Sequence, residues 1–181
     1  ERAPTLRARA FWVLLAFVPS GLMLSTTTFI TTDIVAMPML WVVPLGLYLL
    51  SFTIAFSERR NAAALMVKLS PVVLLCIGGL SINNAPGKPI LTAIIELVLL
   101  MTVAVTIHAR MYNSRPAPAH LTSFYLAMSL GGVLGGIFSG LLAPLIFDWT
   151  YEHPILVLIA GLLVPQPILF PFVERFWEPR G

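Results

Sequence analysis

Apolar stretches of about the length that crosses a bilayer alternate with short polar segments along the whole chain. These stretches cover residues 11–32, 34–56, 63–82, 89–112, 121–146 and 154–172. A hydrocarbon core about 30 Å thick requires about 20 helical residues, and within it only a helix or a closed barrel satisfies its backbone hydrogen bonds. The pattern therefore predicts an all-α polytopic membrane helix bundle, with six transmembrane helices in a single domain over residues 1–181.

Prolines mark the weakest of these predicted spans. The last stretch is interrupted by Pro165, Pro167 and Pro171, so we expect it to cross as a kinked helix, with a surface-lying segment as the alternative. Prolines inside other predicted spans are expected to kink them. These are Pro19, Pro44 and Pro71.

The positively charged residues indicate which side of the membrane each loop faces. If six spans alternate, ten of the 11 Lys and Arg residues fall on one side and Lys88 alone on the other. Lys and Arg accumulate in cytoplasmic loops. Both termini are therefore expected in the cytoplasm, and the loops near Asn84 and Trp149 outside it.

The composition supports a membrane location and excludes one class of partner. Apolar residues make up 58% of the chain and charged residues 10%, whereas soluble domains have about 25% charged residues. The lipid bilayer is therefore the expected surrounding. The net charge of +3 comes from short clusters between apolar runs, and a nucleic-acid partner, which needs a broad basic face, is not expected.

Glu96 is the residue that is energetically most expensive at its predicted position. It lies seven residues into the fourth predicted span, about 10 Å below the end of that helix. A carboxylate at this depth costs on the order of 3 kcal/mol or more when it faces lipid, so we expect Glu96 to face protein or water. Thr92, one turn earlier on the same face, could donate a hydrogen bond to it. A proton or cation site and a paired structural glutamate both remain open.

A threonine-rich segment at the end of the first predicted span is the second candidate. Thr28 and Thr32 share a helical stripe with Gly21 and Ser25, which would let another helix approach closely. Asp33 follows, and its simplest role is to cap the next helix. The alternative is a polar site that combines Asp33 and the threonines with Glu96 near the outer side.

Glycines in the fifth predicted span predict a tight contact between helices. Three overlapping pairs of small residues four positions apart let two backbones pack without side chains between them. The glycines are Gly131, Gly132, Gly135, Gly136 and Gly140. A phosphate-binding glycine loop is not favoured, because such a loop follows a strand in a soluble domain.

The remaining reactive side chains predict no catalytic site, no metal site and no cofactor. Cys76 is the single cysteine and lies in an apolar run, where we expect it to pack against lipid or the core. The histidines are scattered without metal-ligand spacing. His108 and Arg110 end the fourth span, where cations at the cytoplasmic interface would oppose the helix dipole.

Two long sequence motifs resemble the membrane region of bacterial spermidine-synthase-like membrane proteins, also described as fused major-facilitator/spermidine-synthase proteins. The first covers residues 17–24 (FVPSGLML), 31–34 (TTDI) and 38–52 (PMLWVVPLGLYLLSF), and the second residues 115–118 (RPAP), 120–122 (HLT), 124–126 (FYL), 128–129 (MS), 131–136 (GGVLGG) and 143–148 (APLIFD). The resemblance implies a bacterial inner-membrane protein. It also implies that this chain is a segment of a longer protein, with further spans before it and a soluble synthase-like domain after it.

Three functions follow as hypotheses from the residues and the resemblance. The favoured one is a non-catalytic membrane domain, an anchor or accessory subunit that packs with other membrane subunits or with other spans of the same protein. The second is half of a transporter for a polyamine or other cation, with Glu96 and Asp33 in its path. The third, an aminopropyltransferase, would reside in a domain absent from this sequence, and no family catalytic residue maps onto this chain.

Overall fold

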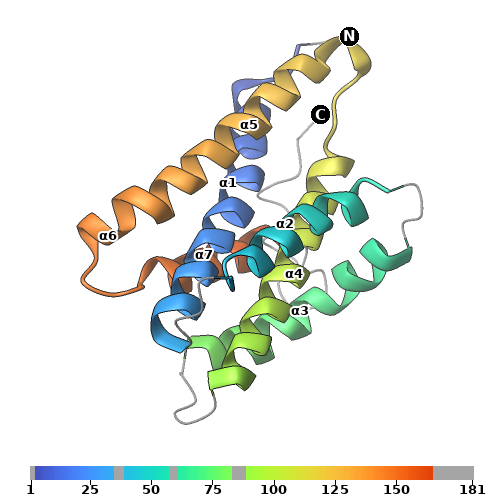
Figure 1. Cartoon of the computed structure of the whole chain (residues 1–181). Coiled ribbons are helices and arrows are strands. Elements are labelled where there is room, and N and C mark those ends of the chain that lie inside the picture. The colour runs from blue at the N-terminus through green and yellow to red at the C-terminus, as the bar shows by residue number, and fades with distance from the viewer. Residues whose placement is uncertain (1–2, 35–38, 58–60, 83–88, 165–181) are drawn as a thin grey trace.

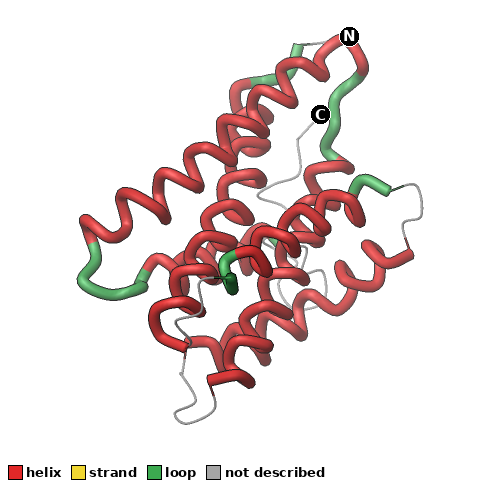
Figure 2. The backbone as a smooth tube through the Cα atoms, in the orientation of Figure 1, coloured by secondary structure: helices red, strands yellow, loops and turns green. Residues whose placement is uncertain are grey.

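The computed structural model describes residues 3–34, 39–57, 61–82 and 89–164, with the backbone alone at 33–34 and 81–82. Throughout this part of the chain the regular structure is helical, as Figures 1 and 2 show. The elements follow one another as α1 (Leu6–Phe29), η1 (Ile30–Ile34), α2 (Val42–Ala55), α3 (Asn61–Ile82), α4 (Pro89–Asn113), η2 (Pro118–His120), α5 (Leu121–Ile137), η3 (Phe138–Leu142), α6 (Ala143–Ile146) and α7 (Glu152–Leu163).

Four helical stretches of the described chain are long and apolar enough to cross a membrane. They are Leu6–Thr32, Asn61–Leu80, Pro89–Asn113 and Pro118–Ile146. Local signals fix several of their ends. The Thr5 hydroxyl accepts a hydrogen bond from the Ala8 N–H at the start of α1, and Pro89 begins α4, where its missing N–H needs no partner. The predicted helical membrane bundle is confirmed at this level.

The second predicted span is shorter than expected. The sequence predicts one helix over 34–56, but η1 continues the first helix to Ile34, Met39–Trp41 form a turn, and α2 covers only Val42–Ala55. Its 14 residues span about 21 Å. The sequence predicts that Pro44 kinks the second span. Pro44 instead lies in the first turn of α2, where the helix needs no N–H donor, so it does not interrupt the helix.

The sixth predicted span also differs. The sequence predicts 154–172, whereas α7 runs over Glu152–Leu163, about 18 Å in length. Val164 has an extended backbone (φ −71°, ψ 133°), as expected for the residue before Pro165. Residues 165–172 lie outside the described part of the chain, so a full crossing by this segment stays a prediction.

A π-helical segment interrupts the fifth span. The five residues of η3, Phe138–Leu142, join α5 to α6. Pro144 lies in the first turn of α6 and cannot donate the hydrogen bond that would continue the α-helix from α5. A wider turn before a proline accommodates that missing bond.

Hydrogen bonds place the start of α1 beside the ends of α4 and α7. The Trp12 indole Nε1 donates to the Ser114 carbonyl oxygen at 3.2 Å, and the Arg110 guanidinium donates to the Leu163 carbonyl oxygen. The Arg110 guanidinium also lies 5.3 Å from the centre of the Phe11 ring. α1 therefore runs antiparallel to α4 and α7, and its first turns lie beside the last turns of both helices.

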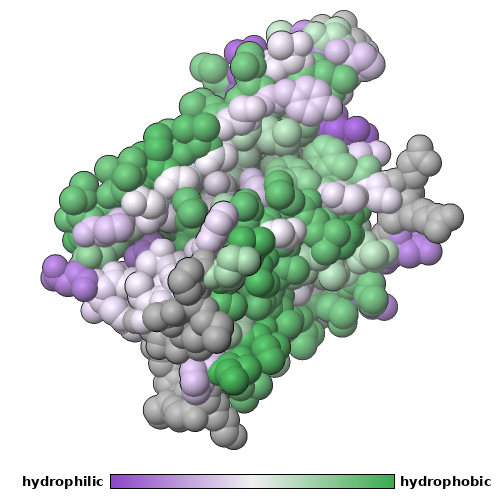
Figure 3. All heavy atoms as spheres, viewed as in Figure 1, coloured by the Kyte–Doolittle hydropathy of each residue, from purple (hydrophilic) through white to green (hydrophobic). Residues whose placement is uncertain are grey.

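Two helices form the interior and two present apolar flanks. α1 packs along α5 and also against α4 and α7, while α4 packs against α2 and α3. Large apolar side chains on α5 and α3 are exposed, among them Leu126, Leu130, Val133, Leu69 and Val72. Figure 3 shows hydrophobic residues over these flanks and hydrophilic residues mainly at the ends. Flanks of this kind suit lipid or other membrane helices.

Candidate functional site

Glu96 lies in a polar cluster formed by α1, α4 and α7. Its Oε2 is 2.9 Å from Nε2 of His153, the second residue of α7. The other ring nitrogen, Nδ1, is 3.0 Å from Oγ of Ser25 on α1. Glu96 and Ser25 are 0% exposed and His153 is 4% exposed. The site is therefore closed off from the surroundings and joins three helices through side chains.

Hydrogen bonds link the three side chains of this cluster. The Ser25 hydroxyl donates to the Leu22 carbonyl oxygen of its own helix at 3.1 Å, and its oxygen lies 3.0 Å from Nδ1 of His153. The 2.9 Å contact between Nε2 of His153 and Oε2 of Glu96 gives the buried carboxyl group a hydrogen-bond partner, which lowers the cost of burying it in the bundle.

Apolar and aromatic contacts hold the histidine ring in place. The Phe29 ring on α1 stacks on the His153 ring at 5.8 Å between centres and 10° between planes. Leu156 and Val157, one turn later on α7, belong to the same buried core as Leu22 and Leu99. The sequence places Pro154 after His153 in the first turn of α7, a position that favours helix initiation. Oε1 of Glu96 is buried and has no hydrogen-bond partner among the described residues.

Hydroxyls in the threonine-rich segment bond to the backbone of their own helix. The hydroxyls of Thr27 and Thr31 donate to backbone carbonyls of Met23 and Thr27 at 2.7 and 2.8 Å, and the Thr32 hydroxyl donates to the Thr28 carbonyl oxygen. Such bonds satisfy these hydroxyls locally. The joining of Thr28 and Thr32 with Glu96 stays a prediction.

Thr92 and Asp33 are the other two residues that the sequence predicts beside Glu96. Thr92 lies one turn before Glu96 on α4 and is half-buried. The side chain of Asp33 lies outside the described part of the chain, so both its capping role and its meeting with Glu96 stay predictions. His153 and Ser25 complete the site. His153 is 57 residues from Glu96 in the sequence, and no local pattern marks that contact.

The glycines of α5 divide into a packed face and an open face. A Cβ atom at Gly131 would lie 2.2 Å from the Val13 carbonyl oxygen, and one at Gly135 would lie 2.3 Å from the Phe17 carbonyl oxygen. α1 therefore lies directly on these two positions. Ser20 and Ser139 reinforce this contact by donating to the carbonyl oxygens of Gly132 and Gly21 at 2.8 and 3.0 Å.

The remaining glycines of the stripe are packed less closely. A Cβ at Gly132 would meet no atom within 4 Å, and those at Gly136 and Gly140 would meet a Leu24 methyl group of α1 in ordinary van der Waals contact, at 3.7 and 3.8 Å. Gly132 directly follows Gly131 and therefore points about 100° away around the helix. A side chain added at Gly132 would therefore have room, whereas one at Gly131 or Gly135 would not.

A second histidine is also buried rather than at the membrane interface. His108 on α4 is 0% exposed, its Nδ1 is 2.8 Å from Ser51 Oγ on α2, and its ring stacks on Phe52 at 3.6 Å. The prediction that His108 acts as a terminal cation of the helix is wrong, because α2 covers this face of α4. Ser51 and His108 thus join α2 to α4, in the same way that Ser25, His153 and Glu96 join α1, α7 and α4.

Comparisons with known proteins returned no relative for this chain. No model of a protein family matches it, and neither the curated proteins nor the solved structures gave a match. Among the described residues, no group of three or more His, Cys, Asp or Glu side chains could hold a metal ion.

Proposed function

We propose that this chain is a non-catalytic membrane domain that serves as an anchor or accessory unit and packs against another transmembrane helix. The uncovered glycine face of α5 carries this proposal. A Cβ at Gly132 would meet open space, and at Gly136 and Gly140 it would meet one Leu24 methyl group in van der Waals contact, while Gly131 and Gly135 on the neighbouring face are covered by the backbone of α1. Small residues four positions apart on a helix surface let a second helix approach closely. In the larger assembly, that helix belongs to another subunit or to another part of the same protein.

The buried polar groups favour this function over chemistry at an open site. Glu96 and His153, with Ser25, form a hydrogen-bonded cluster that joins α1, α4 and α7, and His108 with Ser51 joins α2 to α4. Polar side chains that hydrogen-bond between helices stabilise membrane bundles.

The assembly is tested by comparing Gly132→Leu with Gly79→Leu, since a Cβ added at either glycine would meet no atom within 4 Å and the two lie on different helices. After mild solubilisation from the native membrane, the wild type and Gly79→Leu should have the same particle mass, above that of the chain itself, by light scattering. Gly132→Leu should have a lower mass with an unchanged melting temperature. Equal masses for all three proteins would contradict the proposal.

A transporter half is the second candidate, because Oε1 of Glu96 is buried without a hydrogen-bond partner among the described residues. Such an oxygen could accept a proton or a cation, including a polyamine. Liposomes that contain the purified chain and a pH-sensitive dye distinguish the two functions. The accessory function predicts the same proton flux for wild type, Glu96→Gln and empty liposomes, and a flux that Glu96→Gln abolishes would favour transport.

For localisation, we propose the bacterial inner membrane with both ends of the chain in the cytoplasm. The basic residues support this orientation. Arg7 and Arg9 lie in the first turns of α1, and Arg110 and Arg115 lie at the end of α4 and just after it, so all four belong to the same end of the bundle. An excess of Lys and Arg marks the cytoplasmic side.

A further inference from the structure

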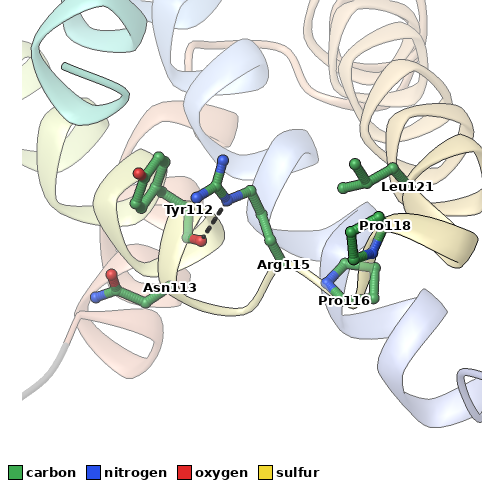
Figure 4. Close-up of a pocket in the computed structure, with 6 residues that line it drawn as sticks. All are labelled: Tyr112, Asn113, Arg115, Pro116, Pro118 and Leu121. Atoms are coloured by element: carbon green, nitrogen blue, oxygen red, sulfur yellow. Dashed lines mark hydrogen bonds between the residues drawn. The ribbon is translucent and has the colours of Figure 1, made fainter. Parts of the chain in front are cut away.

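A cavity of about 490 Å³ opens at the basic end of the bundle, where the chain passes from α4 to α5. It is lined by Tyr112, Asn113, Arg115, Pro116, Pro118 and Leu121 (Figure 4). The linker between the two helices is held against α1, because the Trp12 indole donates to the Ser114 carbonyl oxygen at 3.2 Å. The cavity is thus part of the packed bundle and does not depend on a free loop.

One wall of the cavity presents an oriented guanidinium group. The Arg115 guanidinium carbon lies 3.6 Å from the centre of the Tyr112 ring, and Arg115 Nε donates to the Tyr112 carbonyl oxygen at 3.1 Å. These two contacts fix the plane of the group, which Figure 4 shows between Tyr112 and Leu121. Its terminal nitrogens make no hydrogen bond to the residues that the structure describes. A guanidinium held this way matches the oxygens of a phosphate group.

The opposite wall is apolar. Pro116, Pro118 and Leu121 face the cavity, and Tyr125, one turn after Leu121 on α5, is 46% exposed. Because residues four positions apart lie on the same side of a helix, Leu121 and Tyr125 extend this wall along α5 toward the centre of the bundle. The cavity therefore combines a phosphate-binding group at the end of the bundle with a surface suited to a hydrocarbon chain.

The surrounding charges favour a negatively charged ligand. Arg7, Arg9 and Arg110 lie at the same end as Arg115. The acidic residues Asp148 and Glu152 lie between α6 and α7 or at the start of α7, at the other end, and Glu96 is buried inside the bundle. We propose that this cavity binds one anionic phospholipid, with its phosphate on Arg115 and an acyl chain along Leu121 and Tyr125. Basic pockets between transmembrane helices bind lipid headgroups in this manner.

The proposal is tested with the purified chain in phosphatidylcholine nanodiscs that contain increasing fractions of phosphatidylglycerol, with bound lipid counted by native mass spectrometry. The wild type should saturate at one phosphatidylglycerol. Arg115→Gln should weaken this binding about tenfold, because a charge-assisted bidentate contact is lost. Arg9→Gln removes the same charge from an exposed position outside the cavity and should change the binding less than about twofold, as expected for a screened surface charge. Leu121→Ser should weaken it by a few-fold.

Four outcomes would overturn the proposal, provided that circular dichroism shows each variant folded. They are binding without saturation, equal binding of phosphatidylcholine, equal losses in Arg115→Gln and Arg9→Gln, and displacement of the lipid by inorganic phosphate. The third would indicate diffuse attraction to the whole basic end, and the fourth a site for a small anion.

Discussion

Replacing Gly135 with alanine is expected to lower the free energy of unfolding of the bundle by about 1–3 kcal/mol, as overpacking does in tightly packed interiors. The added methyl group would lie 2.3 Å from the Phe17 carbonyl oxygen and 3.0 Å from the Gly21 nitrogen. Both are backbone atoms of α1, so neither can rotate away. α1 and α5 must therefore separate, which weakens the bond between Ser139 and the Gly21 carbonyl oxygen.

Gly132→Ala is the matched control, because it adds the same methyl group on the same helix where no atom lies within 4 Å. Alanine is the better helix former by about 0.5–1 kcal/mol, so this variant should be unchanged or slightly more stable. Denaturation in mixed detergent micelles measures both. Equal stability of Gly135→Ala and Gly132→Ala would show that α1 does not lie on α5 as described.

Loss of the Glu96 side chain is expected to destabilise the bundle by about 3–5 kcal/mol, the range seen when one partner of a buried ion pair is removed. Glu96→Ala removes the carboxyl group that lies 2.9 Å from Nε2 of the buried His153 ring. Glu96→Gln keeps a hydrogen-bond acceptor at the same place and should be tolerated, with a loss of about 1–2 kcal/mol. Glu96→Lys should not fold, because it places a buried ammonium group where the fold provides no carboxylate partner.

A double substitution tests whether Glu96 stabilises the fold through its contact with His153 or independently of it. In Glu96→Leu with His153→Leu, both polar groups are replaced by apolar ones of similar volume, and such replacements of buried pairs are often neutral. The double variant should therefore be more stable than Glu96→Ala in the same micelles. If the two substitutions were instead additive, the Glu96–His153 contact would not stabilise the fold.

The sequence predicts the long helices well because their ends carry local signals. The structure places α3 and α4 within two residues of the predicted 63–82 and 89–112, since polar turns and a proline bound these apolar runs. α2 is shorter than predicted because hydropathy cannot distinguish a helix from an apolar turn such as Met39–Trp41, and α7 ends at Leu163, where Val164 becomes extended before Pro165. A run of apolar residues indicates that a segment is buried or in contact with lipid. Both a helix and a turn can occupy such a position.

The candidate site could be predicted only in part, for a similar reason. The depth of Glu96 in a span indicates a protein-facing side chain, and the structure buries it completely. Its partner His153 comes from a helix 57 residues away, and only tertiary packing brings the two together. In the same way, the spacing of the α5 glycines predicts a close contact, but the rotation of α5 against α1 selects Gly131 and Gly135 rather than Gly132.

Membrane crossing by the bundle, and the orientation of the crossing, are tested most directly by labelling single cysteines from each side of sealed membrane vesicles. Ala119, in the short helical segment η2 between α4 and α5, and Trp149, between α6 and α7, are both exposed. In a Cys76→Ser background, which removes the exposed native thiol, Ala119→Cys should react with a membrane-impermeant maleimide only from the cytoplasmic side. Trp149→Cys should react only from the outside. Labelling of both cysteines from the same side would contradict a bundle in which Pro118–Ile146 crosses the membrane.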